Sequence, residues 1–122
     1  MPDTYEVRNQ DMDMYIFQGE DWEFKVTILD NDIPRDFTGY TGKMQIREAP
    51  GSPVLLELAT SGSGITLNSI GEINLEIDNT DTTAFEVSKA LYDLKVKETS
   101  SGSITPIVAG NVLIRRQITE MS

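Results

Sequence analysis

The chain has 122 residues, with 20 Asp and Glu against 10 Lys and Arg, and it contains neither His nor Cys. This length predicts a single domain. The absence of Cys and His excludes disulfides, thiolate metal sites and His-dependent catalysis. A net charge of −10 disfavours nucleic acid and anionic membranes as partners, because both are negatively charged themselves.

The first twelve residues are polar and acidic, and they lack the alternation seen in the rest of the chain. We expect residues 1–12 to form a flexible arm, or an edge segment ordered by a partner, ahead of one domain over 13–122. The amino terminus has no basic start or apolar stretch, and no apolar run reaches the ~20 residues of a membrane span, so we expect a soluble, non-secreted protein.

Acidic residues are concentrated near the amino terminus: residues 1–23 contain seven acids and a single base, Arg8. This asymmetry predicts that the amino-terminal region meets a basic partner surface. The candidate interface residues are four acids of this region, Asp3, Glu6, Asp11 and Asp13; the other three acids are Glu20, Asp21 and Glu23.

Apolar and polar residues alternate along most of the remaining chain, which is typical of strands with one buried face. Clear alternation covers 22–28, 43–47, 72–77 and 92–97, and shorter strands are expected at 54–58 and 65–67. The last predicted strand runs from Val108 to Ile118, with a bend or bulge at Gly110.

Turn-forming residues separate these strands, at 30–32, 49–53, 61–64, 68–71 and 99–103. Only 79–87 breaks the alternation, and it predicts one capped helical turn that crosses between sheets, with Phe85 closing the end of the core. Seven or eight short strands with one helical turn predict an all-β antiparallel sandwich, with a small barrel as the alternative.

No group of residues has the spacing of a catalytic, cofactor or metal site, so we predict that the protein is not an enzyme. Asp30, Asp32 and Asp36 offer oxygen ligands for Ca²⁺, but the loop lacks the Gly and distal Glu of an EF-hand, which favours a solvated turn. The loop at 61–64 has no His to activate its serines and no Lys or following helix to hold a phosphate.

Two further features have both a structural and a functional interpretation. Four aromatic residues occupy strand positions typical of core residues rather than of a stacking platform: Trp22, Phe24, Tyr40 and Tyr92. Arg115 and Arg116 form an adjacent basic pair, which is either a solvated strand end or a contact with an acidic neighbouring chain. We take both arginines as candidate interface residues.

Two segments, 18–26 and 33–47, resemble the immunoglobulin-like domain of tailed-bacteriophage structural proteins, including the amino-terminal domain of baseplate upper proteins. The shared features are a Gly-Glu entry at Gly19 into an aromatic strand, a Phe-Thr-Gly-Tyr corner ending at Tyr40, and a strand ending in Ile-Arg at Arg47. The strand at 71–75, the crossover at 78–85 and the strand at 92–94 also fit. The resemblance covers 15–118 and implies an immunoglobulin-like sandwich of seven to eight strands that serves as a virion building block without catalytic residues.

The corner at Gly39 and Tyr40 is expected to be structural. Gly39 would supply a backbone conformation that other residues resist, and Tyr40 would bury its ring while its hydroxyl bonds a backbone group.

The resemblance implies a non-enzymatic virion component, acting as a tail or baseplate adaptor, ring or fibre-attachment subunit. Its expected partners are other virion proteins and further copies of itself, in a virion assembled after synthesis in the host cytoplasm. Tail or baseplate is preferred to capsid. The chain ends after the sandwich, whereas baseplate upper proteins continue into receptor-binding modules, which favours a small adaptor, ring or decoration subunit.

The alternatives are a capsid decoration protein and a carbohydrate-binding module that uses Asp30, Asp32 and Tyr40. A Ca²⁺-assisted hydrolase is a third, weaker alternative.

Overall fold

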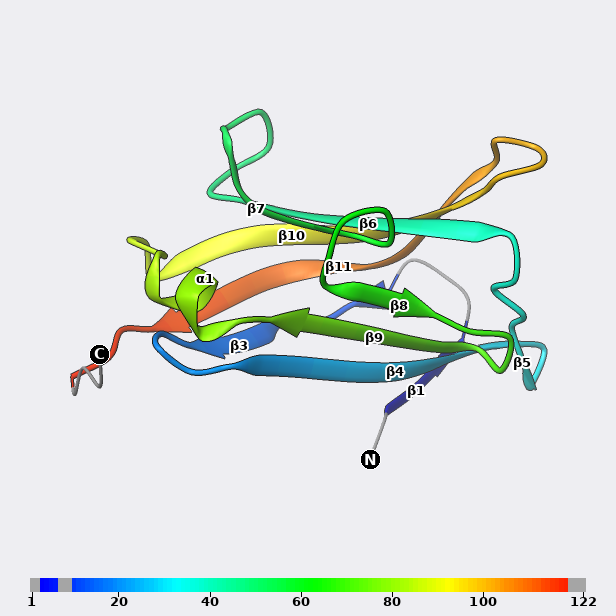
Figure 1. Cartoon of the computed structure of the whole chain (residues 1–122), viewed down its shortest axis with the longest axis horizontal. Coiled ribbons are helices and arrows are strands. Elements are labelled where there is room, and N and C mark those ends of the chain that lie inside the picture. The colour runs from blue at the N-terminus through cyan, green and yellow to red at the C-terminus, as the bar shows by residue number, and fades with distance from the viewer. Residues whose placement is uncertain (1–2, 7–9, 119–122) are drawn as a thin grey trace.

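Two β-sheets packed face to face form the protein in this computed structural model, which describes residues 3–6 and 10–118 (Figure 1). In the described residues the five-stranded sheet has the order β1 (Asp3–Glu6), β4 (Trp22–Asp30), β9 (Glu72–Ile77) and β8 (Ile65–Leu67), with β5 (Ile33–Pro34) beside β4. The six-stranded sheet has the order β2 (Gln10–Asp11), β11 (Ile104–Arg115), β10 (Lys89–Glu98), β6 (Tyr40–Arg47) and β7 (Val54–Ala59), with β3 (Met14–Phe17) beside β11.

This strand order is that of an immunoglobulin domain. Such domains carry strands A, B, E and D in one sheet and C, F and G in the other, and variable-type domains extend the second sheet with C′. The path β1-β4-β9-β8 follows the first order, and β11-β10-β6-β7 follows the second. The structure therefore confirms the predicted all-β, immunoglobulin-like sandwich. It differs from the prediction in having eleven strands within the described residues instead of seven to eight, and in the parallel pairing of β1, β2 and β3.

The core lies between the inner faces of the two sheets, where the predicted alternation brings apolar side chains together. The strands β6, β9 and β10 bury every second residue, and apart from Leu91 the outward residues between the buried ones are polar or charged. The least exposed large side chains are Ile16, Ile28, Met44, Ile46, Ile73, Leu75, Leu94 and Ile107.

The bulge of the last strand lies at a different place from the prediction. Leu94 pairs with Val108 but Lys95 pairs with Pro106, so Ile107 is the extra residue. Both Ile107 and Val108 are buried, because the bulge turns two successive side chains toward the core. The strand also ends at Arg115, so Ile118, which is 94% exposed, does not belong to the buried face.

Gly110 serves a different purpose from the predicted bend. A side chain at Gly110 would collide with the backbone carbonyl of Met12. The Met12 amide donates to the Ala109 carbonyl (2.8 Å), and its own carbonyl accepts from the buried Tyr92 hydroxyl (2.7 Å). The glycine thus allows the amino-terminal segment to lie against β11.

The segment predicted as a flexible arm contributes edge strands to both sheets. β1 pairs in parallel with β4, and β2 pairs in parallel with β11. This differs from the expected arm over 1–12, because backbone hydrogen bonds can hold a polar edge strand that has no apolar alternation. Residues 1–2 and 7–9 lie outside the described residues.

A short helix, α1 (Asn79–Thr83), connects the two sheets as predicted, and Phe85 after it is buried. The capping differs from the prediction, since Asp78 makes no side-chain cap and Asp21 Oδ1 accepts from the Asn79 amide (2.8 Å) instead. No helix in the described part of the chain is long and apolar enough to cross a membrane.

Candidate functional site

The outer face of the six-stranded sheet carries a hollow of about 930 Å³, which we call the basic hollow. Outward side chains of β6, β10 and β11 line it, together with residues 49–51 and 60–61. Figure 1 shows the β6–β7 and β10–β11 hairpins rising from this sheet at its opposite ends. The pleat of the sheet explains the lining, because residues between the core positions point to the opposite side.

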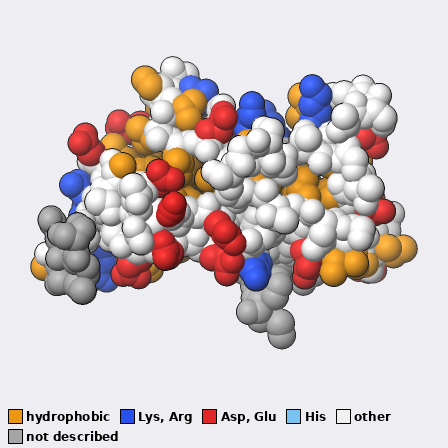
Figure 2. Space-filling view, in the orientation of Figure 1, with side chains coloured by type: hydrophobic (Ala, Val, Ile, Leu, Met, Phe, Trp, Pro, Cys, Tyr) orange, Lys and Arg blue, Asp and Glu red, His pale blue; other side chains and the backbone are white. Residues whose placement is uncertain are grey.

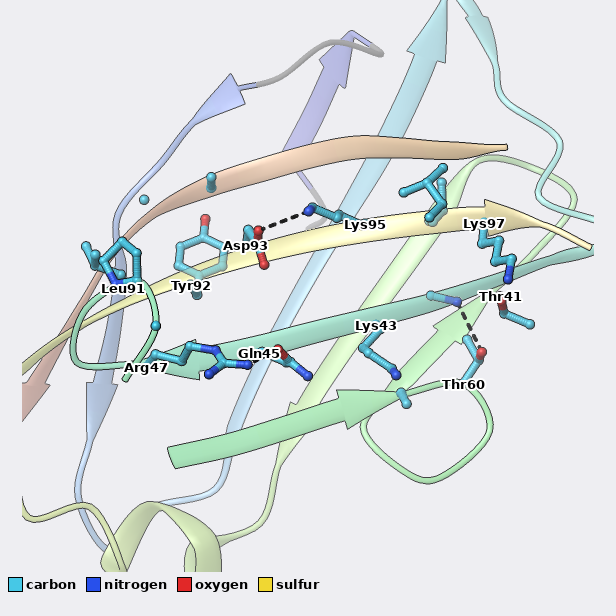
Figure 3. Close-up of a pocket in the computed structure, with 18 of the residues that line it drawn as sticks. Thr41, Lys43, Gln45, Arg47, Thr60, Leu91, Tyr92, Asp93, Lys95 and Lys97 are labelled. Atoms are coloured by element: carbon cyan, nitrogen blue, oxygen red, sulfur yellow. Dashed lines mark hydrogen bonds and ion pairs between the residues drawn. The ribbon is translucent and has the colours of Figure 1, made fainter. Parts of the chain in front are cut away.

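Basic residues dominate this lining. Four of the chain's ten bases and only one of its twenty acids lie there. In Figure 3 the lysines reach from neighbouring strands over the same surface. The five charged residues are Lys43, Arg47, Asp93, Lys95 and Lys97.

Two of the lysines lie directly opposite each other, because the β6–β10 register pairs Lys43 with Lys95. Like charges in this position destabilise a sheet. The Lys95 Nζ is 3.7 Å from Asp93 Oδ2, and this exposed ion pair relieves only part of the repulsion. Within the described residues, the ammonium groups of Lys43 and Lys97 have no carboxylate partner within 4.0 Å.

Arg47 is held more firmly than the lysines. Its Nη1 donates to the Ser52 carbonyl of the β6–β7 hairpin, and its Nη2 donates to Gln45 Oε1 at 2.9 Å. The Gln45 amide in turn donates to Glu57 Oε1 (2.7 Å) on β7. One rim of the basic hollow is therefore fixed, while the lysines on its floor keep their ammonium groups available.

Sequence reasoning missed the basic hollow. Alternation marked Lys43, Lys95 and Lys97 as outward residues of two separate strands. It carried no information that these strands are neighbours in one register, so the like-charge pair was not foreseen. The signal present in the sequence was only the excess of Lys over acid at the outward positions of 92–97.

The predicted acidic interface residues do not form one site. Asp3 and Glu6 lie on β1 of the five-stranded sheet, and Asp11 lies on β2 of the other, with all three side chains outside the described ones. The exposed Asp13 accepts hydrogen bonds from the Asn111 amide (3.2 Å) and from its side chain (3.1 Å). The role of these acids at an interface stays a prediction.

The basic pair lies at and just beyond the end of β11, outside the basic hollow. Arg115 is exposed, and its guanidinium has no hydrogen-bond partner within the described residues. Arg116 instead contacts its own chain, donating to Gln18 Oε1 (3.4 Å) and to the Glu86 carbonyl (3.1 Å). Gln18 is nearly buried, and its amide donates to the carbonyls of Thr83 and Phe85. Arg116 therefore belongs to a junction that joins α1 to β3 and β11.

The predicted corner is correct for Gly39 and wrong for the partner of Tyr40. Gly39 has φ of +81°, a conformation that suits glycine. Tyr40 is only partly buried, and its hydroxyl accepts from Arg35 Nη2 at 2.9 Å rather than bonding the backbone. The tyrosine that bonds a distant backbone group is Tyr92.

The residues proposed for carbohydrate binding are brought near one another around Arg35. Its guanidinium lies 5.4 Å from the centre of the Tyr40 ring, and its Nη1 is 3.9 Å from Asp30 Oδ2. Arg35 therefore covers a ring face on which a sugar would stack. Asp32 occupies a tight turn with φ of 66°, which confirms the turn predicted at 30–32.

The other carboxylates near this turn also serve the local backbone. Asp36 Oδ1 accepts from the Thr38 amide (2.9 Å), and bonds from the Thr38 hydroxyl and amide lower the pKa of Asp36 below its ordinary value. Among the residues that the structure describes, no three His, Cys, Asp or Glu side chains are grouped so as to hold a metal ion.

Comparisons with known proteins find similarity in structure. No protein-family model and no curated protein matches the chain. The chain is similar to the N-terminal domain of phage TP901-1 ORF48, with 9% identity, a TM-score of 0.59, and coverage of 94% of this chain and 99% of that one. It is also similar to the NK cell receptor NKp44, a triggering partner in natural cytotoxicity, with 14% identity, a TM-score of 0.51, and coverage of 88% and 98%. At these identities the likeness concerns the fold, which this chain shares with a phage protein domain.

Proposed function

We propose that the protein is a non-enzymatic structural component of a phage virion, which acts through contacts with other virion proteins as a tail or baseplate adaptor, ring or fibre-attachment subunit. The observation that carries this proposal is the likeness to the phage domain, since the alignment spans 94% of this chain and 99% of that domain. The resemblance of segments 18–26 and 33–47 to phage structural domains points in the same direction. A capsid decoration subunit is the alternative within the same class.

The basic hollow supports a role in protein contact. It is broad and open, and its ammonium groups are available to an acidic partner surface. Charge complementarity of this kind steers partners and sets the register of assembly. The expected partner of the hollow is therefore acidic, whereas the acidic amino-terminal region was predicted to meet a basic surface.

The carbohydrate-binding alternative is less well supported, because Arg35 covers a face of Tyr40 and contacts Asp30. Binding of the purified monomer to a glycan array would favour it over the virion role.

The virion role is tested by particle incorporation of a tagged full-length chain in cells that produce the phage. Removing residues 1–12 would also remove the paired strands β1 and β2, so a point substitution is the cleaner test. We expect the wild-type chain to co-purify with banded particles and Arg115→Glu to lower its incorporation at least tenfold. Lys25→Glu, the matched control on the outer face of β4, should lower it less than twofold. Absence of the wild-type chain from particles would contradict the proposal.

A further inference from the structure

The two outer faces of the sandwich carry opposite charge. Opposite the basic hollow, β4, β9 and the start of α1 present six carboxylates beside the single base Lys25, and Figure 2 shows acidic side chains gathered over this side. Five of the six also line a hollow of about 480 Å³ at the edge of the sandwich, where Leu56–Leu58 of β7 complete the lining, and this lining has no Lys or Arg. We call this surface the acidic face; its residues are Asp21, Glu23, Glu72, Glu76, Asp78 and Asp81.

Each of these surfaces contains a cross-strand pair of like charge. In the basic hollow Lys43 lies opposite Lys95, and on the acidic face Glu23 lies opposite Glu76. Each pair destabilises the isolated chain, because the two charges repel in directly opposed positions. A surface of opposite charge placed against either pair would relieve that repulsion.

We propose that the acidic face of one copy docks on the basic hollow of a second copy. The contact joins two different surfaces, so it is heterologous and repeats into a ring or a filament. Each copy carries both the acidic face and the basic hollow, so a second copy of the chain has the complementary charge to occupy the hollow. This inference deepens the proposed assembly role by naming the partner of the hollow, and its solution test is independent of particle incorporation.

The overall charge of −10 does not prevent this contact at physiological salt. Repulsion between whole molecules is screened beyond a Debye length of ~8 Å, whereas charges in direct contact are screened much less. The same net charge disfavours nucleic acid in the hollow, because outside the hollow 19 acids remain against 6 bases.

The contact should be weak between two isolated copies. The acidic face limits the contact, because its strands β4, β9 and β8 have nine, six and three residues. They span at most about 30 Å by 15 Å, so the contact buries no more than about 450 Å² from each copy. Stable interfaces bury about 800 Å² from each partner. Association should therefore need high protein concentration, and it should strengthen when copies are held in an array.

A charge-swap experiment in sedimentation velocity tests the contact with the purified full chain. One variant, Lys43→Glu/Lys95→Glu, has two acidic surfaces, and the other, Glu23→Lys/Glu76→Lys, has two basic ones. Lys89→Glu is the control, because Lys89 is exposed, lies outside the basic hollow and is not among the candidate interface residues. Melting curves of each variant report whether it is folded.

We expect the wild type and the control to self-associate at about 1 mM in physiological salt (~0.15 M), with at least tenfold weakening at 0.5 M salt. Each swapped variant alone should associate at least tenfold more weakly, and an equimolar mixture of the two should recover association, which also shows that both are folded. A wild type that stays monomeric, or a mixture that stays dissociated, overturns the proposal. Retention of a single-stranded oligonucleotide by Lys43 and Lys95, without self-association, would overturn it in favour of a nucleic-acid surface.

Discussion

The substitution Lys43→Glu should stabilise the isolated chain, because it replaces a like-charge cross-strand pair by an attractive one. Lys43 lies opposite Lys95 on β10 and opposite the uncharged Ala59 on β7. Its diagonal neighbours on β10, Asp93 and Lys97, carry opposite charges, so their effects largely cancel. On β7 the diagonal neighbour Glu57 accepts a hydrogen bond from the Gln45 amide. The directly opposed pair with Lys95 therefore makes the largest contribution to the net change.

The expected size of this effect follows from the exposure of the pair. Opposed charges about 6 Å apart in water interact by ~0.7 kcal/mol before salt screening, and cross-strand pairs contribute roughly 0.2–1 kcal/mol. We expect Lys43→Glu to raise the free energy of unfolding by about 0.5–1 kcal/mol at low salt, with most of the gain lost at 0.5 M salt.

Urea unfolding at low protein concentration measures this change on the monomer, where the midpoint should rise with an unchanged slope. Lys89→Glu is the control, because Lys89 pairs with the apolar Leu113 and has no opposed charge on β11; it should change stability by less than about 0.3 kcal/mol. A destabilised Lys43→Glu chain, or a gain that salt leaves unaltered, would refute the electrostatic reasoning.

Four further substitutions test the packing, the hydrogen bonds and the corner. Tyr92→Phe should destabilise the chain by about 1 kcal/mol through loss of the hydrogen bond to Met12. Tyr40→Phe should destabilise it by less, since the partner of its hydroxyl, Arg35, is partly solvated. Urea unfolding of both variants measures the two losses of stability, and a larger loss for Tyr40→Phe would contradict the assignment. Gly110→Ala should cost about 2 kcal/mol, because the new methyl group forces the Met12 backbone away from β11; an unchanged melting temperature would contradict that contact. Asp36→Ala should destabilise the chain at pH 7, and by less at pH 2. The lowered pKa of Asp36 means that its contribution is complete above the ordinary value of 3.8 and is lost as the pH falls through the folded-state pKa; melts at both pH values would show the loss, and equal destabilisation at the two would argue against it.

The sequence by itself determined most of the strands from Trp22 onward, and which side of each of these strands is buried. The alternation around Val26, Met44 and Ile73 is local, since successive side chains of a strand point to opposite faces whatever lies beside it. Turn residues such as Asn31 and Gly39 can also be predicted from the local sequence, because a positive φ is a property of the single residue that adopts it. These signals sufficed for the all-β sandwich and for the crossover at α1.

Only the tertiary structure decided which strands are neighbours and in what register. An alternation of period two assigns a side chain to a face but not to a partner strand. The pairing of Lys43 with Lys95, and of Glu23 with Glu76, depends on registers between strands far apart in the chain. The opposite charge of the two outer faces therefore emerged only when the strands were placed side by side.

Tyr40, Tyr92 and the amino-terminal strands also show the difference between what the local sequence determines and what tertiary contacts determine. Tyr40 and Tyr92 occupy similar strand positions, but the fold places Arg35 beside the first and the Met12 carbonyl beside the second. Likewise, nothing in the polar sequence of 3–6 marks it as a strand, because its backbone pairing depends on the exposed edge of β4 that the fold presents to it. Local chemistry thus determined most of the elements from Trp22 onward, and the distant contacts of the fold determined their partners and the amino-terminal strands.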